Sequence, residues 1–156
     1  MPAVENAQTA HFELQVELDV GMDRAWKVLT EEIDRWWLPD FRATGEKCVV
    51  TLEARAGGAL RQRAPDGTEL DWYTVQMVVP GSALYLVGYS AKEWGGPNVS
   101  MLKLALSPHE GGTRLTVTDS LIGCVDASRV ATLKEGWEHL FGAGYRDYLQ
   151  GAGGRA

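Results

Sequence analysis

Six short segments with strand-like composition follow one another between residues 47 and 121, and each is joined to the next by a tight turn. The segments are Lys47–Ala54, Ala59–Ala64, Leu70–Val79, Leu84–Tyr89, Val99–Leu106 and Thr113–Leu121. The turns are Gly57-Gly58, Pro65-Asp66-Gly67, Pro80-Gly81-Ser82, Gly95-Gly96-Pro97 and Glu110-Gly111-Gly112. Such residues favour chain reversal. Because parallel neighbours need crossovers of about a dozen residues or more, this spacing predicts a six-stranded antiparallel meander.

Two further patterns precede the meander. Apolar residues alternate with polar ones over His11–Leu18, which predicts a half-buried strand. From Ala25 to Trp37 the apolar residues recur at helical spacing, and Pro39 ends that pattern. We expect a break near Thr30, which would divide this stretch into two short helices.

The apolar period changes from two to about 3.6 after Val125, which predicts a long amphipathic C-terminal helix. Its apolar stripe consists of Val130, Leu133, Trp137, Leu140, Phe141, Gly144, Tyr145 and Tyr148. Only this helix is long enough to cover the apolar face of the sheet. We therefore expect an α+β fold in which a curved antiparallel sheet of about seven strands wraps around the final helix. A cleft between sheet and helix is a natural place for a ligand.

Length and charge limit the classes of protein that fit this chain. The 156 residues suit one domain, with an ordered core at about residues 11–150 and flexible ends. A net charge of −6 opposes binding to nucleic acid or anionic lipid. The chain has no apolar run of about 20 residues and no leader-like start, so we expect neither membrane insertion nor secretion. Cys48 and Cys124 lack metal-site or redox spacing, and we expect reduced thiols in the cytoplasm.

Several motifs resemble the START-like superfamily, also called Bet v 1-like, SRPBCC or helix-grip, and within it the family of the activator of Hsp90 ATPase. The motifs are Ala25-Trp26-Lys27-Val28-Leu29, Trp36-Trp37, Gly57-Gly58-Ala59-Leu60, Val75-Gln76-Met77-Val78-Val79-Pro80, Gly112-Thr113-Arg114-Leu115-Thr116-Val117-Thr118 and Gly136-Trp137-Glu138-His139-Leu140. The resemblance covers nearly all of residues 11–150 and implies the helix-grip fold. Asp119-Ser120 stands where that family often carries a histidine. The chain lacks the N-terminal domain with which the eukaryotic cochaperone docks, so an Hsp90-type chaperone is not the expected partner.

Aromatic residues are the candidate ligand contacts. Trp72, Tyr73, Tyr85, Tyr89 and Trp94 offer flat apolar walls with hydroxyl or indole donors, although core packing is the competing explanation for the strand aromatics. The predicted ligand-binding set is Trp37, Phe41, Tyr73, Tyr85, Tyr89, Trp94, Trp137, Phe141 and Tyr145. We expect the loops at residues 38–45 and 90–98 to flank the cavity mouth, with Trp94 on a lid.

Asp119 is the one candidate catalytic residue. Strand alternation places it on the same face as Leu115 and Val117, where burial would raise the pKa of its carboxyl group and suit acid or base chemistry. The alternative is that Asp119 ends the strand and caps the turn into the last helix. His11, His109 and His139 do not form a recognisable site, so we expect neither a metal nor a cofactor.

Three functions fit these patterns. The leading hypothesis is noncatalytic binding of a small hydrophobic or aromatic molecule. The second is a cyclase- or hydrolase-like enzyme that uses Asp119, with Tyr73, Tyr85 or Tyr145 orienting the substrate. The third is a cochaperone-like interaction module with a solidly packed interior. A homodimer formed through a free sheet edge or through Trp36-Trp37 remains open.

Overall fold

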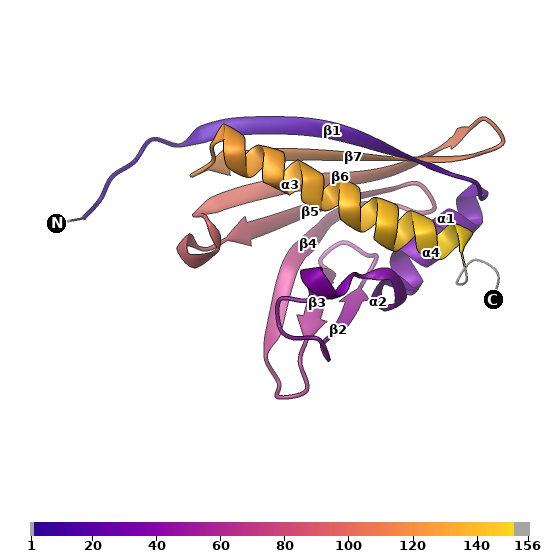
Figure 1. The fold of residues 1–156 in the computed structure, drawn as a ribbon, viewed down its shortest axis with the longest axis horizontal. Helices are drawn as coiled ribbons and strands as arrows, with labels where there is room; N and C mark the ends of the chain where they lie inside the picture. Colours follow the sequence, from indigo (N-terminus) through magenta and orange to yellow (C-terminus); the bar gives the residue numbers. More distant parts are fainter. Residues whose placement is uncertain (1, 152–156) are drawn as a thin grey trace.

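The computed structural model describes residues 2–151 (Figure 1). The flexible end predicted after residue 150 falls almost entirely outside these residues. The strands are β1 (Gln8–Leu18), β2 (Val49–Leu52), β3 (Ala59–Arg63), β4 (Glu69–Val79), β5 (Ala83–Ser90), β6 (Asn98–His109) and β7 (Gly112–Gly123). The helices are α1 (Met22–Glu31), α2 (Ile33–Trp36), α3 (Ala127–His139) and α4 (Asp147–Gln150), with 3-10 turns at Pro39–Phe41 and Lys92–Trp94. Within residues 2–151, none of the helices has the length and apolar content needed to cross a membrane.

The seven strands form one antiparallel sheet in the order β1-β7-β6-β5-β4-β3-β2, as the meander and the opening strand predict. Register shifts at Leu60/Arg61 and at Val75/Met77 interrupt the ladders on both sides of β4. Bulges of this kind bend a strand and increase its twist. Accordingly, β2, β3 and part of β4 descend below the final helix in Figure 1, while β1 and β7 run above it. The fold is the expected curved sheet wrapped around a C-terminal helix.

The final helix is continuous but changes its geometry midway. Helix α3 passes at Leu140 into a π-helical segment that ends at Arg146, and α4 follows directly. The large side chains of the π segment fill the concave side of the sheet: Phe141 is 2% exposed and Tyr145 is fully buried. The Tyr145 hydroxyl donates a hydrogen bond of 2.6 Å to the carbonyl oxygen of Ala25. This half of the interior is therefore solidly packed.

The predicted division into two short helices is confirmed, and it bears on the Trp36-Trp37 pair. The break lies at Glu32, two residues after Thr30, and separates α1 from α2. The Thr30 hydroxyl donates a hydrogen bond to the Trp26 carbonyl oxygen and stays inside α1. Trp36 and Trp37 are only 3% and 6% exposed, so this pair does not offer a surface for a dimer. The Trp36 indole instead donates to the carbonyl oxygen of Val28.

Glycine at position 144 permits the close approach of the π segment to α2. A Cβ atom there would lie 2.6 Å from the carbonyl oxygen of Trp36. We expect Gly144→Ala to lower the free energy of unfolding by about 1–3 kcal/mol, because a backbone atom must shift to accommodate the methyl group. Urea denaturation followed by circular dichroism measures this loss.

Gly142→Ala is the matched control in the same segment. Its Cβ would meet only the guanidinium of Arg146, at 3.7 Å. This variant should stay within about 1 kcal/mol of the parent chain, since alanine is the better helix former. Equal losses in the two variants would contradict the packing explanation.

Candidate ligand-binding pocket

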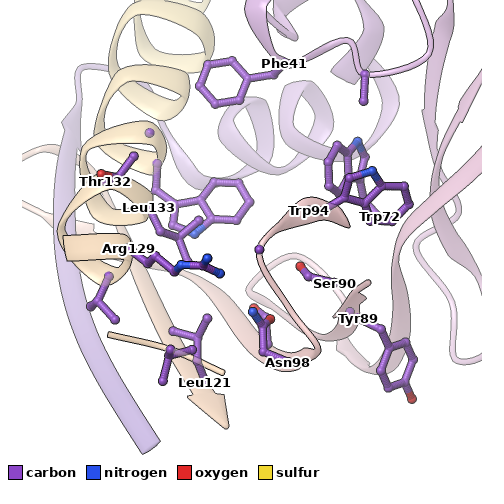
Figure 2. Close-up of a pocket in the computed structure, with 18 of the residues that line it drawn as sticks. Phe41, Trp72, Tyr89, Ser90, Trp94, Asn98, Leu121, Arg129, Thr132 and Leu133 are labelled. Atoms are coloured by element: carbon purple, nitrogen blue, oxygen red, sulfur yellow. The ribbon is translucent and has the colours of Figure 1, made fainter. Parts of the chain in front are cut away.

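A cavity of about 570 Å³ lies between α3 and the strands β4, β5 and β6. Three parts of the chain form its wall: the loop after α2, the strand ends with the turn at Lys92–Trp94, and α3 itself. Figure 2 shows Phe41 on one side, Leu133 and Thr132 on α3, and Trp72 and Trp94 facing them. The loops at residues 38–45 and 90–98 both contribute lining residues.

Aromatic rings dominate the wall. Trp72 and Trp94 lie against each other with ring centroids 6.4 Å apart, and Tyr73 and Trp137 lie 6.2 Å apart. Phe41 closes the side nearest α2. Tilted contacts at these distances are favourable between aromatic rings. The pocket therefore presents flat apolar surfaces, and contacts between neighbouring rings hold these side chains in place.

Six of the nine predicted ligand contacts line this pocket, and three do not. Those in the wall are Trp37, Phe41, Tyr73, Tyr89, Trp94 and Trp137. Tyr89 lies at the rim: its side chain is 69% exposed, and Figure 2 shows its ring directed away from the cavity. Trp94 is 55% exposed and lies at the mouth, with its ring tilted against that of Trp72.

The remaining three predicted contacts lie elsewhere for simple geometric reasons. Tyr85 sits between Leu84 and Leu86, which face the core, so alternation sends its ring to the outer face, where the Lys103 ammonium lies 5.1 Å from the ring centroid. Phe141 and Tyr145 belong to the packed π segment, beyond the end of the cavity.

Sequence reasoning missed several residues of the wall. Arg129, Leu133 and Gly136 come from α3, and Asn98 and Ser100 come from β6. Leu133 belongs to the predicted apolar stripe, and that stripe was the signal that could have placed it in the wall. Trp72 also lines the pocket, although the predicted ligand set omits it. Polar side chains on strands carry no comparable signal, because their face depends on register.

The loop that carries Phe41 is fastened to the sheet by a buried amide. Gln62 is fully buried on β3, and its Nε2 donates a hydrogen bond of 2.7 Å to the Phe41 carbonyl oxygen. Its Oε1 accepts from the Thr44 amide at 3.4 Å and from the Cys48 thiol at 3.6 Å. Arg42 adds an ion pair with Asp34 at 2.8 Å. This side of the pocket is therefore fixed by polar contacts.

Asp119 lies behind the pocket floor, in the middle of β7. One carboxylate oxygen accepts from the Ser100 hydroxyl at 2.6 Å, and the other accepts from the Trp137 indole at 3.0 Å. The Tyr73 hydroxyl lies 2.9 Å from Ser100 Oγ. Because Ser100 has one proton and donates it to Asp119, Tyr73 must donate to Ser100. Ser100, Tyr73 and Trp137 line the cavity, so they stand between Asp119 and any ligand.

The environment of Asp119 shifts the pKa of its carboxyl group upward. Burial is the largest cause, and the hydrogen bonds from Ser100 and Trp137 oppose it. The neighbouring Tyr73 phenol also has a raised pKa, because it is buried and lies near the Asp119 carboxylate. The alternative role of Asp119 as a helix cap was wrong: Asp126 caps α3 by accepting from the Arg129 amide at 2.9 Å.

This raised pKa gives a pH dependence with a definite sign. The folded chain holds the Asp119 proton to higher pH than the unfolded chain does. Stability therefore falls as pH rises from the ordinary aspartate range through the folded-state pKa, by at most about 1.4 kcal/mol per pH unit. We expect the stability of the parent chain relative to Asp119→Asn to decrease across that window in urea titrations. A difference that stays constant from about pH 4 to about pH 8 would contradict this account.

Within the part of the chain that the structure describes, His, Cys, Asp and Glu side chains form no group of three or more that could hold a metal ion. His109 lies 3.2 Å from Glu17 at a surface turn, and His139 lies near the ring of Phe41. His11 lies in β1, so the three histidines occupy separate places in the fold.

Solved structures with the same fold include several bacterial proteins. The Mll3558 protein from Rhizobium loti is 22% identical, with a TM-score of 0.66 over 87% of this chain and 94% of that chain. An AHSA1-like protein from Aeromonas hydrophila is 17% identical, with a TM-score of 0.60 over 92% and 94% of the two chains. DynU16, a putative protein in the dynemicin biosynthetic locus, is 23% identical, with a TM-score of 0.64 over 90% of this chain and 47% of that chain.

At these identities the similarity establishes the fold alone. No functionally curated protein matches the sequence. The family model described as Activator of Hsp90 ATPase homolog 1-like protein matches residues 19–149, from the end of β1 to α4. The chain therefore belongs to the family of Activator of Hsp90 ATPase homolog 1-like proteins, within the SRPBCC superfamily.

Proposed function

We propose that this protein binds a small hydrophobic or aromatic molecule in the pocket between the sheet and α3. The observation that carries the proposal is the cavity of about 570 Å³ walled by Trp37, Phe41, Trp72, Trp94 and Trp137. Small-molecule sites are typically concave, mostly apolar and about 300–1,000 Å³ in volume. Superfamily members commonly bind hydrophobic ligands, which supports the same function.

The wall is preorganised for such a ligand. Trp137 is held by Asp119, Tyr73 by Ser100, and the Phe41 loop by Gln62. Side chains that are already ordered lose little further entropy on binding, so more of the apolar contact appears as affinity. At about 0.3 kcal/mol per atom, a ligand of about 20 non-hydrogen atoms gains about 6 kcal/mol, which corresponds to a Kd of tens of micromolar. Titrations should therefore cover the micromolar range.

The contacts of Asp119 favour a structural role over acid–base catalysis. Both carboxylate oxygens already accept hydrogen bonds, and Ser100 and Trp137 separate them from the cavity. A general base must lie within hydrogen-bond reach of the proton it removes. We therefore rank the cyclase- or hydrolase-like function below simple binding.

The cavity also weighs against a cochaperone-like role as the principal function. That role was expected to use an exposed surface above a solidly packed interior. Here only the half of the interior around Trp36, Phe141 and Tyr145 is packed in that way. The other half of the interior, beside α3, contains the pocket and suits ligand binding.

We propose the cytoplasm as the compartment. Both cysteines are free: Cys48 is buried beside Gln62, and Cys124 is partly buried ahead of α3. Free thiols are the usual state in reducing compartments.

The function can be tested with the neutral dye N-phenyl-1-naphthylamine, whose fluorescence increases in apolar sites. We expect saturable one-site binding to the parent chain, together with a rise in melting temperature by mass action. Leu133→Trp should weaken binding at least about tenfold, because the larger ring occupies the cavity. Native mass spectrometry of the purified protein then looks for a copurifying compound.

Ala131→Trp is the matched control, since Ala131 is exposed on the same helix and does not line the pocket. This variant should bind the dye as the parent chain does. If the parent chain does not bind the dye, or if both variants lose it equally, the pocket is not the binding site.

A further inference from the structure

We propose that the ligand is a monoanion, an aromatic or aliphatic molecule with one carboxylate-like group, and that Arg129 binds this group at the pocket mouth. The inference rests on the proposed binding function and specifies its ligand class. Among the lining residues, Arg129 is the one that carries a positive charge. Figure 2 shows its guanidinium projecting from α3 toward Asn98 and Leu121, next to the apolar wall.

The fold makes room for this guanidinium. A Cβ atom at Gly95 would lie 2.6 Å from Arg129 Nη1 and 3.3 Å from Arg129 Cζ. Gly95 also has a φ of +91°, a conformation that residues with a side chain rarely adopt. The guanidinium therefore lies against the backbone of Gly95, at the end of the Lys92–Trp94 turn. This placement keeps it beside the cavity mouth.

The existing ion pair of Arg129 is weak enough for a ligand to replace. Its Nε lies 3.7 Å from Asp126 Oδ2, and the two side chains are 52% and 62% exposed. Exposed pairs of this kind contribute little to stability, because water screens both charges. Nη1 and Nη2 lie on the Gly95 side. A planar carboxylate can accept two hydrogen bonds from a guanidinium, which is stronger than a single contact.

The surroundings favour one negative charge and oppose two. Arg129 lies in the first turn of α3, a helix of 13 residues whose amino end attracts anions. The Asn98 amide and the Ser128 hydroxyl also line the mouth and can donate hydrogen bonds. Against this, Asp40 and Asp126 are acidic and the chain carries a net charge of −6. A single cation therefore fits a monocarboxylate better than a phosphate dianion.

Two dyes with almost the same aromatic body provide the test. 1-Anilinonaphthalene-8-sulfonate carries one negative charge, and N-phenyl-1-naphthylamine carries none. We expect Arg129→Gln to weaken binding of the sulfonate about tenfold or more and to leave the neutral dye within about twofold. Higher salt should weaken only the sulfonate, because screening acts on the charged contact.

Asp126→Asn tests the contact between Arg129 and the ligand by removing the acidic group that competes for Arg129. Asparagine caps a helix about as well as aspartate does, so α3 stays intact while the competing charge is removed. The sulfonate should then bind several-fold more tightly, with the neutral dye unchanged. Arg55→Gln, which removes an exposed ion pair with Glu53 outside the pocket, should change neither dye.

The outcomes separate the two levels of the proposal. If Arg129→Gln leaves sulfonate binding unchanged, or weakens both dyes equally, the acidic-group inference is wrong while the binding function stands. If the parent chain binds neither dye, the proposed function itself fails. Leu133→Trp must weaken both dyes in the parent background, which shows that each occupies the pocket.

Discussion

The hydrogen bond from the Trp137 indole to Asp119 determines where the interior is filled and where it is open. It fastens the middle of the final helix to the centre of β7, with a length of 3.0 Å. On the carboxyl side of this contact, Phe141 and Tyr145 pack against Trp36 with ring centroids 5.9 and 5.1 Å away. On the amino side, the cavity separates α3 from the strands β4, β5 and β6.

Burying a carboxylate costs free energy of folding unless its oxygens accept hydrogen bonds. The fold therefore requires the two donors of Asp119 to stay in place. Ser100 and Trp137 are therefore held in position, and Tyr73 is oriented through Ser100. Ser100, Trp137 and Tyr73 all belong to the pocket wall. Asp119 thus affects the pocket indirectly, because it orders side chains that a ligand would contact.

Periodicity was sufficient to predict the fold, because the change from period two to period 3.6 and the short turns leave few arrangements. It was also sufficient to place Asp119 inside, on the face of Leu115 and Val117. The ligand contacts were predicted less well, because residues were chosen for being aromatic and not for their place in the fold. Tyr85 alternates to the outer face, and Tyr145 lies beyond the cavity. The pairing of Asp119 with Ser100 depends on strand register, which the spacing of residues does not reveal.

The two sides of the pocket are fastened unequally. The Phe41 loop is attached to β3 through Gln62, a buried side chain. The turn at Lys92–Trp94 is held mainly by hydrogen bonds within itself, from Trp94 and Gly96 to Ala91, and by the ring contact between Trp72 and Trp94. Segments with fewer cross-links open at lower free energy. We therefore expect a ligand to enter and leave by outward movement of the turn that carries Trp94, while the Phe41 loop on the opposite side stays in place.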